Sequence, residues 1–162
     1  MEHAGALLRN CTERLALAGL IACAPVLPAW AQSEGGLYIA GYEVDFERAA
    51  GDGLSRNPPG QRFFLLVLPP HTAALTSAAP KSASAAREHV VAANGVILVC
   101  QRDIDSGAID SSKLVPGVVA VRGWPPAGSS TLPAGQRHFA DEDPAKLPQA
   151  NEALWRIRST CS

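Results

Sequence analysis

Aromatic residues are scarce in this chain, and its charge is both sparse and balanced. Phe, Trp and Tyr make up 6% of the 162 residues, charged residues make up 18%, and the formal net charge is −1. Lys and Arg are scattered along the sequence, whereas a nucleic-acid-binding surface gathers them on one face. So few aromatic side chains also argue against a platform on which bases stack. We therefore expect no nucleic acid among the partners.

The common site motifs are absent as well. The sequence contains no G-x-S-x-G, Walker or G-x-G-x-x-G pattern. Its histidines form no H-x-x-x-H pair, and the acidic run at 141–143 lacks the glycine and glutamate spacing of a calcium loop. The sequence therefore predicts no metal site and no cofactor.

Residues 1–31 have the order of a secretory signal peptide. Two arginines precede an uncharged apolar run at 15–27, and Ala29 and Ala31 then place small residues where a signal peptidase cleaves. The run is short and interrupted by proline, so we expect no stable membrane span. Lipoprotein processing at Cys23 is the less favoured route, because the apolar run continues past that cysteine. We expect cleavage after Ala31 and a periplasmic or secreted protein.

The rest of the chain is expected to form one α/β domain, residues 32–123, followed by a Pro-rich arm and a C-terminal helix, 124–162. Continuous apolar runs are typical of parallel strands buried on both faces. Strands are expected at 37–44, 63–68, 96–100 and 118–121. Helices are expected at 46–54, 83–94, in part of 103–113 and at 148–159. This alternation predicts a three-layer α/β fold with an open, mainly parallel sheet and right-handed crossovers.

Apolar spacing predicts which faces of these helices are buried. Asp45 stands at the N-cap position of the first helix. The helix at 83–94 should bury Ala86, Val90, Val91 and Ala93. The last helix should bury Leu147, Ala150, Leu154, Ile157 and Cys161, which step by three and four residues. Trp124 and Trp155 are expected to anchor the core or the arm.

Two cysteines remain after cleavage, and Cys100 is the more informative one. It ends a predicted parallel strand, where ligands and reactive groups gather in open α/β sheets. Arg102 and the start of a short helix would favour its thiolate, while Asp103 would oppose it. His71 also follows a buried strand; it either approaches Cys100 across the sheet as its base or is simply exposed. A buried cysteine that only packs is the alternative.

Residues 94–123 carry a resemblance to a known family. Ala-Asn-Gly-Val-Ile-Leu-Val-Cys at 93–100, a short glycine-containing helix and Leu-Val-Pro-Gly-Val at 114–118 resemble the DsrE/DsrF-like family of small sulfur-relay proteins. The resemblance implies a DsrE/YchN-like fold, a tendency to form homo-oligomers and, in some members, a strand-end cysteine that carries a persulfide. Only Cys100 matches that position.

Three states of the cysteine pair remain open at this point: a structural disulfide, a redox-active or sulfur-carrying pair, or two unrelated thiols. The first function hypothesis is a periplasmic sulfur (persulfide) carrier or thiol-redox protein. In it Cys100 and Cys161 are the catalytic residues, Arg102 and His71 contact the substrate, and a sulfur donor or acceptor protein is the partner. The alternative is a non-catalytic accessory or assembly protein with structural cysteines. Whether the chain is an enzyme therefore stays open.

Overall fold

The computed structural model describes residues 34–124, 139 and 142–162. The predicted signal peptide at 1–31, its cleavage site and most of the Pro-rich arm lie outside the described residues. The boundaries predicted at 31 and 123 therefore stay predictions.

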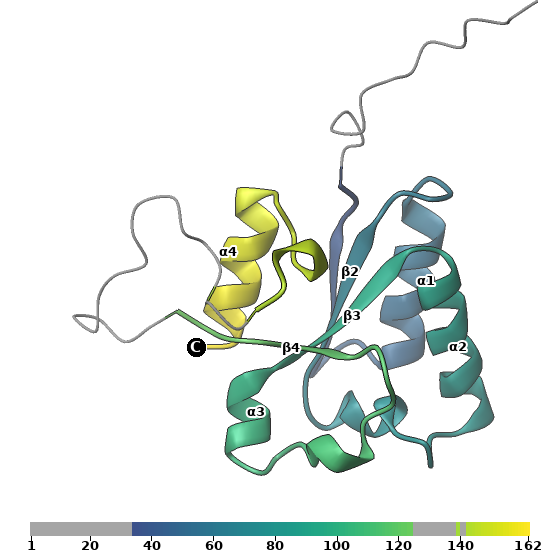
Figure 1. The fold of residues 1–162 in the computed structure, drawn as a ribbon. Helices are drawn as coiled ribbons and strands as arrows, with labels where there is room; N and C mark the ends of the chain where they lie inside the picture. Colours follow the sequence, from purple (N-terminus) through teal and green to yellow (C-terminus); the bar gives the residue numbers. More distant parts are fainter. Residues whose placement is uncertain (1–33, 125–138, 140–141) are drawn as a thin grey trace, which may run out of the picture. The chain divides into compact units, whose positions relative to one another are not determined.

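Four parallel strands form one sheet in the order in which they occur along the chain (Figure 1). They are β1 (Leu37–Ala40), β2 (Phe63–Val67), β3 (Gly95–Cys100) and β4 (Val119–Val121). All five residues of β2 are buried, as its continuous apolar run predicts. This sheet and the helices on its two faces confirm the three-layer α/β fold.

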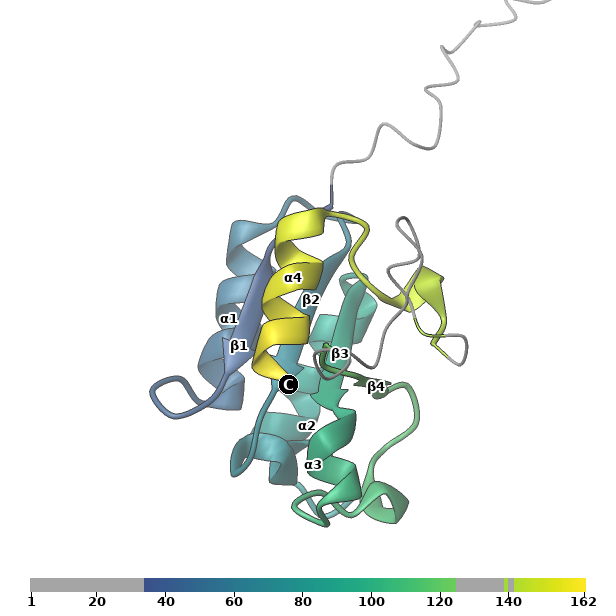
Figure 2. The same cartoon turned by 90° about the vertical axis from the view of Figure 1, so that its left-hand side faces the viewer.

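Two crossover helices cover one face of the sheet, which we call the helical face. They are α1 (Phe46–Arg56) and α2 (Lys81–Ala92), and they lie side by side in both ribbon views (Figures 1 and 2). The sheet and these helices share a core that includes Phe46, Phe63, Leu65, Val90 and Ile97. Because the strand order is sequential, both right-handed crossovers must pass over this same face.

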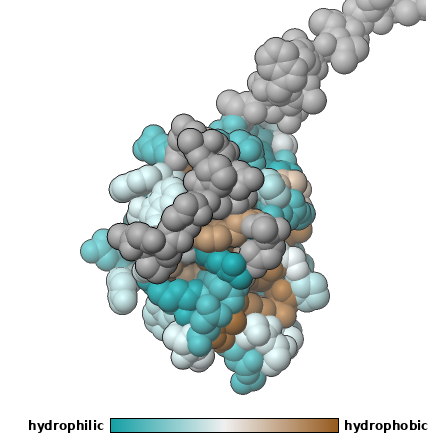
Figure 3. All heavy atoms as spheres, turned by 60° about the vertical axis from the view of Figure 1, so that its left-hand side comes forward, coloured by the Kyte–Doolittle hydropathy of each residue, from teal (hydrophilic) through white to brown (hydrophobic). Residues whose placement is uncertain are grey.

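The opposite face, which we call the C-terminal face, is covered by α4 (Asn151–Thr160) (Figure 2). Its separate core contains Phe64, Leu66, Leu98, Cys100, Val121, Leu147, Ile157 and Cys161. Hydrophobic residues also reach the surface on this side of the domain, among hydrophilic ones (Figure 3). The two cores follow from strand alternation, which sends successive residues of β2 and β3 to opposite faces.

The third crossover is not a full helix. After the short α3 (Gln101–Asp105) and a turn of 3-10 helix, Ser111–Lys113, the chain returns to β4 as an extended segment, residues 114–118. The return segment is fixed at its start, where Leu114 bridges Thr76 and the N–H of Val115 donates to the carbonyl of Leu75 at 2.9 Å. The helical face is consequently left without a third helix beside α2.

The expected burial differs at several positions, and the short crossover explains the one on α2. Val91 is 59% exposed instead of buried, because no helix packs against its side of α2. Trp155 on α4 is also 59% exposed, so its expected role as a core anchor is wrong. Ala150 precedes α4 and is exposed as well. Across the described ranges, no helix combines the length and the apolar character that crossing a membrane requires.

Candidate functional site

Cys100 and Cys161 are joined by a disulfide bond between the sheet and the last helix. Their sulfur atoms lie 2.04 Å apart, their Cα atoms lie 5.1 Å apart, and they are separated by 61 residues in sequence. Cys100 is the last residue of β3 and the N-cap of α3, whereas Cys161 is the C-cap of α4. The two cysteines are therefore not unrelated thiols, while a structural disulfide and a redox-active pair in its oxidised form are both compatible with this bond.

Both cysteines are sealed inside the core of the C-terminal face. Cys100 is 0% exposed and Cys161 is 2% exposed. Strand alternation places Cys100 on the same face as Leu98, and helical spacing places Cys161 one turn after Ile157. In this state neither sulfur is an accessible thiolate, which is the form that attacks a sulfur donor.

Arg102 stands beside the disulfide but is already engaged. Its Nε lies 3.3 Å from Oδ1 of Asp103, and its Nη1 donates a hydrogen bond to the carbonyl of Ser162. The other carboxylate oxygen of Asp103 is buried without a hydrogen-bond partner among the described residues. The cation expected near Cys100 is therefore present, and it holds the end of the chain that follows Cys161.

His71 is not brought to Cys100. It begins a turn of 3-10 helix, His71–Leu75, whose Ala74 and Leu75 pack into the core of the helical face. Cys100 belongs to the core on the other side of the sheet. No contact between the two side chains is found in the described part of the chain, so the role predicted for His71 stays a prediction.

The sequence analysis missed a buried ion pair that holds α4. Arg158 donates from Nη1 to Oε1 of Glu142 at 2.7 Å and from Nη2 to Oε2 at 2.6 Å. The two side chains are 0% and 6% exposed. Arg158 also donates to the carbonyl of Arg122 at 2.8 Å, and its guanidinium lies 4.8 Å from the ring centre of Phe139. Such a two-pronged arrangement fixes orientation as well as charge.

The carboxylate of Glu142 is held in its charged form. It accepts hydrogen bonds from the N–H groups of Arg122 at 3.0 Å and Phe139 at 3.2 Å. Burial raises the pKa of Glu142, but the hydrogen bonds and the charge of Arg158 outweigh it, so the pKa lies below its usual range. One signal could have revealed this pair: Arg158 interrupts the apolar face of α4 between Leu154 and Cys161.

The end of α4 docks against the residues that follow β4. A Cβ atom added to Gly123 would lie 2.5 Å from the carbonyl oxygen of Cys161 and 2.5 Å from the backbone of Ser162. The N–H of Trp124 donates to the hydroxyl of Ser162 at 2.8 Å. The disulfide, the ion pair and this contact all fasten α4 to the sheet edge at β3 and β4.

A groove of about 390 Å³ lies beyond the carboxyl ends of the strands, between the loop after β2 and residues 108–114. Its charged groups pair with one another, because Lys113 contacts Asp110 at 3.1 Å. Hydrogen bonds from Ser112 and Lys113 lower the pKa of Asp110. In the described residues, no three His, Cys, Asp or Glu side chains converge as metal ligands would.

Chemically, the arrangement around Cys100 is a buried disulfide beside the partly exposed ion pair of Arg102 and Asp103. It presents no free thiol, and its nearest cation is bound within the protein. The resemblance to sulfur-relay proteins stays a prediction from residues 94–123. No protein-family model matches the chain, and no curated protein matches it either.

Proposed function

We propose that this chain is an exported, non-catalytic accessory protein whose disulfide fastens its last helix to the sheet. The observation that carries the proposal is the Cys100–Cys161 bond, with both sulfurs buried. Buried, bridged cysteines are typical of structural disulfides, whereas relay cysteines are exposed and reactive. The second function hypothesis from the sequence is therefore favoured over the first.

A persulfide carrier would need a different state of the same residues. A dithiol would first have to deliver two electrons and two protons to the bridge, and α4 would have to leave the sheet before a sulfur donor could reach Cys100. The buried pair of Arg158 and Glu142 opposes that movement, because breaking a buried ion pair is strongly unfavourable. The predicted donor or acceptor protein and the predicted homo-oligomer stay predictions.

The disulfide also supports the proposed location. Disulfides persist in oxidising compartments and are rare in the reducing cytosol. A stable bond between Cys100 and Cys161 fits the signal peptide predicted at 1–31 and cleavage after Ala31. We propose that the mature protein resides in the periplasm or outside the cell.

Intact mass spectrometry and thiol alkylation of the exported protein test this function. The chain is expressed with its own N-terminal region in a bacterial host and purified from the periplasm without reductant. We expect a mass lighter by two hydrogen atoms than the reduced chain. We also expect no alkylation under native conditions, because both sulfurs are bonded and buried.

Two results would overturn the proposal. Rapid alkylation of Cys100 in the native protein would show an accessible thiol. An added sulfur atom on Cys100 would show persulfide loading and would favour the sulfur carrier. Retention of the chain in the cytosol with both thiols reduced would separately overturn the location.

A further inference from the structure

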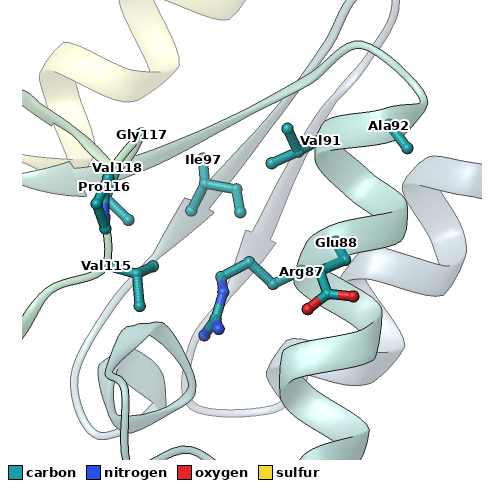
Figure 4. A pocket seen from close by; sticks show the side chains of 9 residues that line it. All are labelled: Arg87, Glu88, Val91, Ala92, Ile97, Val115, Pro116, Gly117 and Val118. Atoms are coloured by element: carbon teal, nitrogen blue, oxygen red, sulfur yellow. The ribbon is translucent and has the colours of Figure 1, made fainter.

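The missing third crossover helix leaves an apolar groove on the helical face. The groove holds about 350 Å³ and runs between α2 and the return segment, residues 114–118 (Figure 4). Val91, Ala92, Ile97, Val115, Pro116 and Val118 line it. Its volume lies in the range of small-molecule sites, about 300–1,000 Å³. The return segment is hydrogen-bonded in place, so the groove exists without a ligand.

One cation lies in this apolar setting. Arg87 extends from α2 toward Val115, below Ile97 (Figure 4). Its Nη1 donates to the carbonyls of Ala74 at 2.7 Å and Thr76 at 3.4 Å. These bonds orient the guanidinium, while its Nε and Nη2 make no hydrogen bond or ion pair within the described residues. A half-buried guanidinium with donors to spare is suited to a carboxylate.

We infer that this groove binds a small molecule with an apolar body and a single carboxylate. The carboxylate would accept hydrogen bonds from Arg87, and the apolar body would cover Val91, Ile97 and Val118. Burial of that body supplies affinity, and the charge fixes which end points toward Arg87. The inference goes beyond the proposed function, because it uses neither cysteine and lies on the opposite face of the sheet.

Glu88 limits the charge that the ligand can carry. Its exposed carboxylate also borders the groove, one residue along α2 from Arg87. A second negative group on the ligand would be repelled by Glu88, so dicarboxylates and phosphate esters are disfavoured. A zwitterion would instead gain a partner for its ammonium group. The site is therefore expected to accept monocarboxylates and to discriminate against more highly charged anions.

Backbone amide shifts in an NMR titration of the purified full chain test the inference, with hexanoate as the probe. Hexanol and hexylamine serve as probes of the same length with a neutral and a positive head group. We expect saturable shifts at α2 and at 114–118 with hexanoate. We expect binding at least about tenfold weaker for hexanol, because the charged hydrogen bonds are lost. Hexylamine should also bind more weakly than hexanoate, because Arg87 repels its ammonium group and only the exposed Glu88 could pair with it.

Three variants locate the site. Ala92→Trp should fill the groove and abolish the hexanoate shifts, whereas Ala85→Trp, on an exposed position of α2 that does not line the groove, should leave them unchanged. Arg87→Met should weaken hexanoate by about tenfold and leave hexanol unchanged. If Arg87→Met disturbs the loop at Ala74 and Thr76, the comparison of Ala92→Trp with Ala85→Trp still tests whether hexanoate binds in the groove.

Three outcomes would overturn the inference. The first is that hexanoate produces no saturable shift. The second is that hexanol binds as tightly as hexanoate, and the third is that Ala92→Trp binds hexanoate with the affinity of the parent chain. None of these outcomes bears on the redox state of Cys100, so the two proposals fail independently.

Discussion

The two faces of the sheet are held by different kinds of interaction. On the helical face, α1 and α2 are crossovers whose ends are both tied to neighbouring strands, and they share an apolar core with the sheet. On the C-terminal face, the ten residues of α4 are attached by a disulfide, a buried ion pair and a close backbone contact. Covalent and charged contacts are concentrated where chain connectivity is weakest.

The difference has an entropic reason. A crossover helix is confined by the strands at both of its ends, so little further entropy is lost when it packs. The helix α4 follows β4 only after residues 122–150, and a longer connection makes docking more costly. A cross-link restricts the unfolded chain and offsets that cost. The C-terminal face should therefore be the part of the domain that responds to reductant, acid and side-chain truncation.

Removal of the disulfide should have the largest effect on that face. For a separation of 61 residues, the chain-entropy relation gives a loss of about 4 kcal/mol in the free energy of unfolding for Cys100→Ala with Cys161→Ala. Urea unfolding of the oxidised parent and the variant measures it. Reductant should lower the stability of the parent to near that of the variant and leave the variant unchanged. Equal stability of both proteins would contradict this account.

Loss of the buried carboxylate should rank second. Glu142→Gln removes the carboxylate that pairs in two-pronged fashion with the buried Arg158, and we expect a loss of about 3 kcal/mol in the free energy of unfolding. The amide oxygen can still accept from one of the two N–H groups, which reach separate carboxylate oxygens, and Arg158 keeps its bond to the carbonyl of Arg122, so the expected loss lies at the low end of the range. Urea denaturation at neutral pH gives the value. Asp110→Asn, which breaks the exposed pair with Lys113, is the matched control and should change nothing measurable.

The same variant should show how this stability depends on pH. The pKa of Glu142 is lowered in the folded protein, so its stabilising effect is complete above the ordinary glutamate pKa of about 4.3. It is lost as the pH falls through the lower pKa of the folded state. The stability difference between the parent and Glu142→Gln should therefore shrink in that acidic window. A difference that stays constant down to pH values below it would refute the assignment.

A smaller loss is expected where the chain end packs on Gly123. The Cβ of Gly123→Ala would lie 2.5 Å from backbone atoms of Cys161 and Ser162, so α4 must shift, at a cost of about 2 kcal/mol. Gly51→Ala is the control on the other face, because nothing lies within 4 Å of its added Cβ. In the middle of α1 it should stabilise by about 0.5–1 kcal/mol. Thermal unfolding of both variants measures the two effects. A Gly123→Ala variant as stable as the parent would show that the close contact is unimportant.

The helical face could be predicted from the sequence because its signals are local. Continuous apolar runs located β2 and β3 within one residue of their observed ends, and Asp45 was correctly placed as the N-cap of α1. The same local reasoning failed at Val91, because its burial depended on a third helix that the chain replaces with an extended segment.

The C-terminal face could be predicted only in part. Helical spacing placed Cys161 on the buried side of α4, but spacing cannot tell which sulfur it meets, so the bridge remained one of three alternatives. In the pair of Glu142 and Arg158, Glu142 lies outside any helix or strand, where the sequence has no periodicity. The only sequence signal for the pair is the charge of Arg158 on the apolar face of α4. Long-range polar contacts have no sequence period, which is why periodicity misses them.

The smallest effects are expected at the N-terminal ends of α1 and α4, which are capped in different ways. Asp45 caps α1 by accepting the N–H of Arg48 at 2.8 Å, a local contact that the sequence predicted. The start of α4 has no such local cap, since its N-cap is Ala150. Glu34 accepts the N–H groups of Gln149 and Ala150 there, each at 2.9 Å or less, from before β1.

Asp45→Ala and Glu34→Ala should each cost about 1 kcal/mol of unfolding free energy, since each removes acceptors for N–H groups at a helix start. Hydrogen exchange separates them. Because Asp45 acts within its own helix, its loss should speed exchange at the start of α1 alone. Because Glu34 joins the chain before β1 to α4, its loss should speed exchange at the start of α4. Faster exchange in α1 after Glu34→Ala would show that the two faces are not held independently.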